Sequence, residues 1–163
     1  MLLKLLKFMR KGVIGIGDFT SVKKMRNEMS KWLDGYHWDV WFTGTFKPEM
    51  ALKDTITTKK CFDRFLADLK KEHHVNKGMD FFIAVERFKH GEYTHIHALL
   101  NGVGGLTNKD IWQTWFKRYG RAVVEDYNRK EGAAHYVTKY VTKSICDWDL
   151  SIRPWDGNYR LFN

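Results

Sequence analysis

Two groups of residues have types and spacings suited to chemistry on phosphate. The first is a tandem Tyr-x-x-Lys repeat, with Tyr136 before Lys139 and Tyr140 before Lys143. A phenol has a pKa of about 10 and is a weak nucleophile at neutral pH, so a tyrosine that attacks phosphate needs a cation beside it. The second group is the His-x-His sequence at 95–97, and imidazoles are common metal ligands. Together the motifs suggest phosphoryl transfer to a tyrosine.

The segment 80–100 predicts a β-hairpin that positions the histidines. With a tight turn at the His-Gly of 90–91, Glu86 lies opposite His95. Opposed residues have Cβ atoms about 5 Å apart on one face, and His97 shares that face because strand side chains alternate. The register therefore predicts a cation site formed by Glu86, His95 and His97. The other face is apolar throughout: Phe81, Ile83, Val85, Ile96, Ala98 and Leu100.

This ligand set favours a divalent metal ion. In a chain with seven histidines a His-x-His pair arises easily by chance, and paired histidines on a strand are often only hydrogen-bonded. The cross-strand Glu86 and the apolar face behind it favour the cation site. Two imidazoles and one carboxylate leave coordination positions open, and a phosphate substrate would favour Mn²⁺ or Mg²⁺. Zn²⁺ also tolerates this set but is the less favoured ion.

The repeated Tyr-x-x-Lys is coherent only as a helix. A strand would place valines and lysines together on one face, whereas a helix forms an apolar stripe from Ala133, Val137 and Val141. Tyr136 and Tyr140 then lie about 6 Å apart along the axis, flanked by the lysines. Taken alone, these tyrosines could simply pack while the lysines face solvent. The predicted cation site favours chemistry instead.

Other elements surround these motifs. Periodicity and capping residues predict strands at 40–46 and 122–124, helices at 57–74 and 107–120, an outer helix at 21–33, and a helix start with an Asn128/Glu131 capping box. This order predicts the α+β class, with an antiparallel sheet backed by helices. We expect a single domain over 1–163, with an N-terminal arm and helix at 1–39, a motif-bearing core at 40–147 and a tail at 148–163.

Composition restricts the partners. The 163 residues include 28 lysines and arginines against 19 acids, a formal net charge of +9, which favours a polyanion such as nucleic acid. With 44% apolar residues the chain can bury a core. Lysines interrupt the apolar first eight residues, so we expect no membrane partner. Cys61 and Cys146 lack metal-ligand spacing and suit reduced thiols in the cytoplasm.

The motifs resemble those of a known family. A His-hydrophobic-His strand, a carboxylate one strand earlier and a following Tyr-x-x-Lys helix are similar to the HUH endonucleases that initiate rolling-circle replication of plasmids and small viruses. The Trp-Phe-Thr-Gly-Thr-Phe sequence at 41–46 resembles the family's first motif. The three motifs follow the family's order over 41–143. The doubled tyrosine resembles the two-tyrosine, phage-type initiators.

The resemblance implies a fold and a reaction. The sheet would have about five strands, RRM- or ferredoxin-like, with the His-x-His strand central and the tyrosine helix over it. A tyrosine would attack a phosphodiester of single-stranded DNA at an origin or origin hairpin, forming a 5′-phosphotyrosine and a free 3′-OH. Later strand transfer would rejoin the DNA. A host polymerase would extend the 3′-OH, and a host helicase is expected because no ATP-binding Gly-x-x-x-x-Gly-Lys-Ser/Thr occurs.

The resemblance also implies residue roles. Glu86, His95 and His97 would hold the ion, Tyr136 would be the first nucleophile, Lys139 would neutralise phosphate, and Tyr140 would be a second nucleophile or a supporting side chain. The expected DNA contacts are Thr43, Thr45, Arg87 and Lys143.

Three alternatives stay open from the sequence. One is a non-catalytic, RRM-like module that binds single-stranded nucleic acid by stacking bases on Trp41, Phe82 and Tyr93. Another is a HUH-type transposase. The third is a zinc hydrolase for a small substrate.

Overall fold

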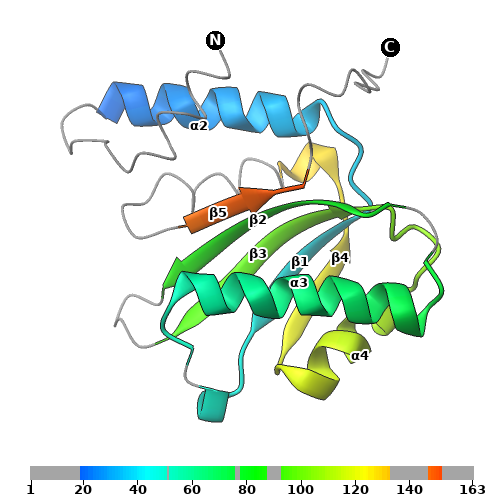
Figure 1. Cartoon of the computed structure of the whole chain (residues 1–163). Helices are drawn as coiled ribbons and strands as arrows, with labels where there is room; N and C mark the ends of the chain where they lie inside the picture. Colours follow the sequence, from blue (N-terminus) through cyan, green and yellow to red (C-terminus); the bar gives the residue numbers. More distant parts are fainter. Residues whose placement is uncertain (1–18, 51, 76–77, 88–92, 133–146, 152–163) are drawn as a thin grey trace.

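A five-stranded antiparallel sheet forms the middle layer of the structure, in the order β4-β1-β3-β2-β5 (Figure 1). The computed structural model describes residues 19–50, 52–75, 78–87, 93–132 and 147–151. The strands are β1 (Val40–Thr45), β2 (Asp80–Arg87), β3 (Thr94–Asn101), β4 (Ala122–Asp126) and β5 (Asp147–Leu150). The α-helices in this part of the chain are α2 (Phe19–Asp34), α3 (Thr55–Glu72) and α4 (Asn108–Arg118), with 3₁₀ turns η1 (Pro48–Met50) and η2 (Arg129–Glu131).

The chain order explains the sheet order. From β1 to β4 the elements run β1-α3-β2-β3-α4-β4, the βαββαβ arrangement of ferredoxin-like folds. In the resulting order β4-β1-β3-β2, the His-x-His strand β3 lies between β1 and β2, and β5 pairs with the outer edge of β2. The predicted α+β fold with a central His-x-His strand is confirmed. The short β5 includes the first residues of the segment expected as a tail.

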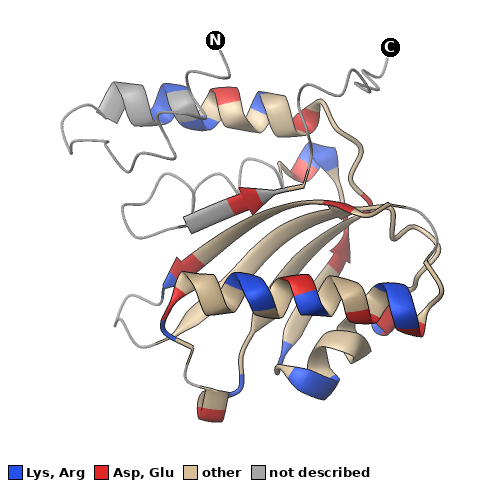
Figure 2. Cartoon of the chain, viewed as in Figure 1, with Lys and Arg blue, Asp and Glu red and all other residues tan. Residues whose placement is uncertain are grey.

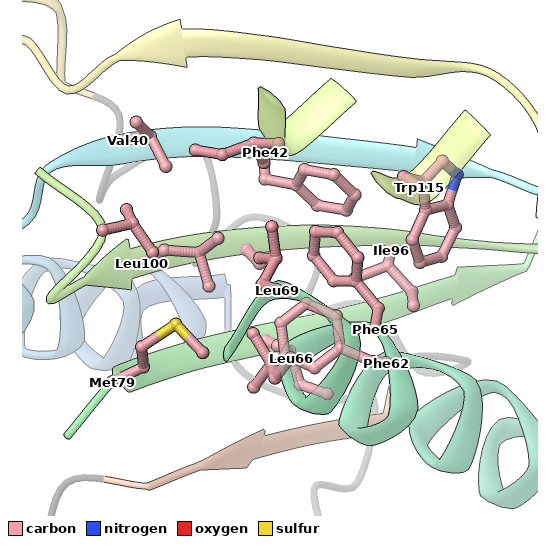
Figure 3. Close-up of a cluster of buried hydrophobic side chains, with 14 of the residues drawn as sticks. Val40, Phe42, Phe62, Phe65, Leu66, Leu69, Met79, Ile96, Leu100 and Trp115 are labelled. Atoms are coloured by element: carbon pink, nitrogen blue, oxygen red, sulfur yellow. The ribbon is translucent and has the colours of Figure 1, made fainter. Parts of the chain in front are cut away.

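Helices α3 and α4 cover one face of the sheet and bury the main core. Phe42 of β1 lies between Phe65 of α3, at 5.1 Å between ring centroids, and Trp115 of α4, at 5.2 Å (Figure 3). All three are fully buried, and burial of each such side chain contributes about 1.5–3 kcal/mol. A Cβ on Gly44 would lie 2.7 Å from the Trp115 ring, so glycine allows α4 to pack this closely on β1.

Side-chain caps begin both helices. Thr107, the predicted N-cap of α4, accepts from the Asp110 amide while the Asp110 carboxylate accepts from the Thr107 amide, which is a complete capping box. Asp54 caps α3 by accepting from the Thr57 amide at 2.6 Å. Because Asp54 supplies the cap, α3 begins at Thr55, two residues before the predicted start.

Helix α2 covers the opposite face of the sheet (Figure 1). Its Met29 and Leu33 are fully buried against a second cluster that includes Phe82 of β2 and Leu99 of β3. The expectation of one apolar face and one purely polar face was therefore wrong. The second face is apolar along half of its length and needs a helix to cover it.

The C-terminal end of α2 is held at the end of β4. The Tyr127 hydroxyl donates to Oδ1 of Asp34 at 2.7 Å, and the Arg129 guanidinium donates to the Asp34 carbonyl. Burial, and then the hydrogen bond to Asp34, raise the pKa of Tyr127, so its phenol stays protonated as this donor. This contact places the C-terminus of α2 beside the start of β1, because β1 and β4 are antiparallel.

Candidate metal centre

The β2–β3 hairpin has the predicted register. Glu86 pairs with His95, and Ala84 pairs with His97. Strand alternation then places Glu86, His95 and His97 on the face that α2 covers at its other end. Small Ala84 opposite His97 leaves room for the imidazole ring. The register prediction is confirmed, because a slip of one residue would have turned all three side chains into the main core.

The three side chains converge on one point. Nε2 of His95 lies 2.9 Å from Oε2 of Glu86, and Nε2 of His97 lies 3.3 Å from the same oxygen. The two imidazole centroids are 4.7 Å apart with the rings edge to face. Atoms that bind one ion at about 2.1 Å lie roughly 3 Å apart, so small side-chain movements would let these three atoms bind one cation. Among the described residues they form a group that could hold a metal ion.

The cluster is sheltered on its inner side and open on its outer side. The His97 side chain is 5% exposed, whereas His95 is 14% and Glu86 is 17% exposed. The His97 ring lies 5.9 Å from the Trp41 ring between centroids, beside the apolar cluster under α2. An ion held here would be reached by a substrate from the side of Glu86 and His95.

The donor atoms fit a divalent ion of intermediate hardness. Imidazole nitrogen suits transition metals, and carboxylate oxygen suits Mg²⁺ and Mn²⁺. Three protein ligands leave coordination positions for substrate oxygens, as in catalytic sites. The side chains present can therefore hold a divalent cation, while the identity of the ion remains an expectation.

Thr43 belongs to this cluster. It lies directly opposite His97 in the β1–β3 register, and its Oγ1 is 3.2 Å from Nδ1 of His97. Thr45 lies opposite His95 and is exposed. The sequence named both threonines as DNA contacts, but the structure places the Thr43 hydroxyl on a ligand histidine. Sequence reasoning missed this contact because it joins residues 54 positions apart.

A family model for replication-associated proteins of the ORF2 type matches residues 39–145. This is well over half of the chain. The chain belongs to this family. The match begins one residue before β1, includes the whole Glu/His/His cluster and extends past Lys143. The family agrees with the replication-associated part of the predicted resemblance. Neither the curated proteins nor the solved structures gave a match to the chain.

In this replication-associated protein the tyrosine motif lies outside the described residues, so the roles of Tyr136, Lys139, Tyr140 and Lys143 stay predictions. The expected capping box before it does not form. Asn128 instead caps the single turn η2 and donates from Nδ2 to Glu131 at 2.9 Å.

Gly132 ends this turn with a φ of 71°. This left-handed conformation terminates a helix, so a continuous helix from Asn128 was wrong.

Arg87 is exposed at the end of β2. Because it follows Glu86 directly, strand alternation places it on the opposite face from the metal cluster. A DNA contact from Arg87 would therefore have to come around the end of the strand.

The predicted aromatic platform for base stacking is mostly covered. Trp41 is 9% exposed and Phe82 is fully buried, because both pack beneath α2, whereas Tyr93 is 39% exposed. The expectation that Trp41 and Phe82 could stack bases was therefore wrong. Within the described part of this replication-associated protein, no helix has the length and apolar character needed to cross a membrane.

Proposed function

We propose that this chain is a metal-dependent DNA nickase and ligase that initiates rolling-circle replication. The main support is the convergence of Glu86, His95 and His97 on one point of the central strands, inside a replication-associated family match. The same match continues through the Tyr-x-x-Lys repeat that could supply the nucleophile. A site with cation ligands and a tyrosine motif suits phosphoryl transfer better than simple binding.

The reaction is a transesterification at phosphorus in single-stranded DNA. The hydroxyl oxygen of Tyr136 attacks the scissile phosphorus, the bond to the 3′ oxygen breaks, and that oxygen leaves with a proton as a 3′-OH. The product is a 5′-phosphotyrosine. Attack by a 3′-OH on this bond reverses the step, releases the phenol and rejoins the strand. No external energy source is needed because one phosphodiester replaces another.

Each motif residue has a part in this proposal. Glu86, His95 and His97 hold Mn²⁺ or Mg²⁺, which when bound would stabilise negative charge on the phosphate oxygens. Lys139 neutralises the phosphate next to Tyr136. Tyr140 acts as a second nucleophile in the closing step or supports the first.

The surrounding residues guide the DNA. Thr45 on the site face, Lys143 in the motif, and Arg87 at the strand end contact the single strand or origin hairpin. A host polymerase then extends the 3′-OH, and a host helicase unwinds the template in the host cytoplasm.

Covalent trapping tests the proposal. Labelled single-stranded oligonucleotides that tile the DNA around the gene are incubated with the protein and Mn²⁺, then separated on a denaturing gel. We expect a protein–DNA adduct that disappears with chelator and in the Tyr136→Phe, Tyr140→Phe double variant. Comparison of the two single variants assigns the first nucleophile, which we expect to be Tyr136.

Two results would contradict the proposal. One is an adduct that persists in the double variant. The other is chelator-resistant binding with no adduct on any oligonucleotide, which would indicate the non-catalytic binding module. Activity that needs tight zinc but neither tyrosine would indicate a hydrolase.

A further inference from the structure

The hydroxyl of Thr43 contacts the most buried ligand of the metal cluster. It lies 3.2 Å from Nδ1 of His97, while Nε2 of the same ring faces Glu86 at 3.3 Å. Both ring nitrogens of His97 therefore have a polar neighbour on the site face. The ring is also enclosed, with His95 edge to face at 4.7 Å and Trp41 at 5.9 Å between centroids.

The position of the ring hydrogen decides whether His97 can bind a metal ion. An ionised carboxylate only accepts hydrogen bonds, so the contact with Glu86 assigns the hydrogen of the neutral ring to Nε2. Nδ1 is then an acceptor, and the Thr43 hydroxyl donates to it. A metal ion, however, needs the lone pair of Nε2. The ring that binds the ion must carry its hydrogen on Nδ1.

A hydroxyl can serve both states of this ring. It donates or accepts by rotating about its C–O bond, whereas a carbonyl only accepts and an ammonium only donates. When the cation enters, the Nε2 proton is released to solvent and Nδ1 takes up a proton from solvent. The ring stays neutral and keeps one N–H. Thr43 then accepts from Nδ1–H without any movement of the imidazole.

We infer that Thr43 is a positioning residue that holds His97 in place and stabilises its metal-binding tautomer. The inference rests on the proposed metal-dependent function and deepens it, because it assigns to the first sequence motif a role in cation binding. Hydrogen bonds to the second nitrogen of a ligand histidine fix the ring and typically change metal affinity by about 10- to 100-fold.

The same strand supplies a matched control. Thr45 lies two residues from Thr43, on the same face, and opposite the other ligand histidine, but it is exposed. Valine replaces threonine with nearly the same shape and suits a strand equally well. Thr43→Val and Thr45→Val therefore make the same chemical change at neighbouring positions, and only the first removes the hydroxyl next to Nδ1 of His97.

The test measures metal binding without DNA. Mn²⁺ is titrated calorimetrically into the wild type and the Thr43→Val, Thr43→Ser and Thr45→Val variants. We expect Thr43→Val to lower Mn²⁺ affinity about tenfold. Thr43→Ser, which keeps the hydroxyl, and Thr45→Val should bind Mn²⁺ as the wild type does.

Nitrogen NMR of the imidazoles supplies a second readout. In protein loaded with diamagnetic Zn²⁺ we expect His97 to bind through Nε2 and to show an exchange-protected Nδ1–H. This signal should persist in Thr43→Ser and disappear through solvent exchange in Thr43→Val.

Three results would overturn the inference: unchanged Mn²⁺ affinity in Thr43→Val, equal losses in Thr43→Ser and Thr43→Val, or coordination through Nδ1. Failure to form a DNA adduct would contradict the proposed nicking function and leave these metal measurements standing.

Discussion

Among single residues, Glu86 is the centre of the candidate site. One of its oxygens is the common neighbour of both imidazoles, at 2.9 and 3.3 Å. The carboxylate thus brings the two Nε2 atoms together before any cation is bound. Preorganisation of this kind lowers the cost of assembling the ligands. Glu86 is also among the more exposed members of the cluster, on the side open to substrate.

Replacement of this carboxylate should weaken cation binding. We expect Glu86→Gln to lower Mn²⁺ affinity by more than about tenfold, because the amide is neutral and no longer accepts from both imidazoles. Calorimetric titration of Mn²⁺ measures the change. Glu125→Gln is the matched control, since Glu125 is an exposed carboxylate on β4, opposite Trp41 and therefore on the same sheet face. Equal losses in both variants would mean that only the general field of negative charge attracts the ion.

Among the elements, two strands carry the cation ligands and α4 holds the neighbouring strand in place. Trp115 packs over Gly44, which separates Thr43 from Thr45, and its indole N–H donates to the Thr45 carbonyl at 3.3 Å. The helix thus fixes the height of β1 against β3. Its own start depends on the capping box of Thr107 and Asp110.

The capping box should make the stability of the protein depend on pH. Hydrogen bonds from the Thr107 side chain and amide hold the pKa of Asp110 below its usual value. A lowered folded-state pKa stabilises the fold above the unfolded-state pKa of about 3.9, and this contribution disappears as the pH falls through the folded-state pKa. We therefore expect the wild type to be more stable than Asp110→Asn at neutral pH, with a gap that closes below about pH 4.

Urea unfolding of both proteins at a series of pH values measures this gap. Glu125→Gln, which neutralises an exposed strand carboxylate, should leave the acid dependence of the wild type nearly unchanged. A gap between wild type and Asp110→Asn that is constant down to low pH would show that the carboxylate charge is unimportant for the cap.

In the molecule as a whole, the sheet separates two different surfaces. Helices α3 and α4 cover one face, and α2 covers part of the face that carries the metal cluster (Figure 1). Lysines and arginines lie on both helical layers (Figure 2). Because the C-terminus of α2 is held beside the start of β1, its N-terminal half extends toward the end of the sheet where the cluster lies.

This arrangement predicts which basic residues attract DNA. Lys23 and Lys24 are exposed near the N-terminus of α2, on the cluster side, whereas Lys70 and Lys71 are exposed near the C-terminus of α3, on the opposite side. We expect single-stranded DNA binding by the Lys23→Gln, Lys24→Gln pair to depend less steeply on salt. The slope of log affinity against log salt should fall by about 0.7 for each phosphate that the substituted side chains no longer neutralise.

Fluorescence anisotropy at several salt concentrations gives these slopes. The Lys70→Gln, Lys71→Gln pair has the same change in net charge and should keep the wild-type slope. Equal reductions in the two pairs would indicate a general basic field without a preferred face.

Features that depend on local chain geometry could be predicted from the amino-acid sequence. The strand period of two and a tight turn were enough to align Glu86 with His95, because a hairpin joins neighbouring segments and a slip would expose its apolar face. Capping chemistry likewise located the start of α4 at Thr107. The Asn128 prediction failed because the local pattern did not account for the left-handed Gly132 that ends the turn.

Which side chains share the site could be learned only from the folded chain. The Thr43–His97 contact and the burial of Trp41 and Phe82 under α2 depend on strand order and on helix packing between segments distant in sequence. Periodicity reports that a side chain has an apolar or polar face but does not report which element will cover that face. That choice depends on the total burial of all the layers, and here it turned a proposed DNA contact into a neighbour of a metal ligand.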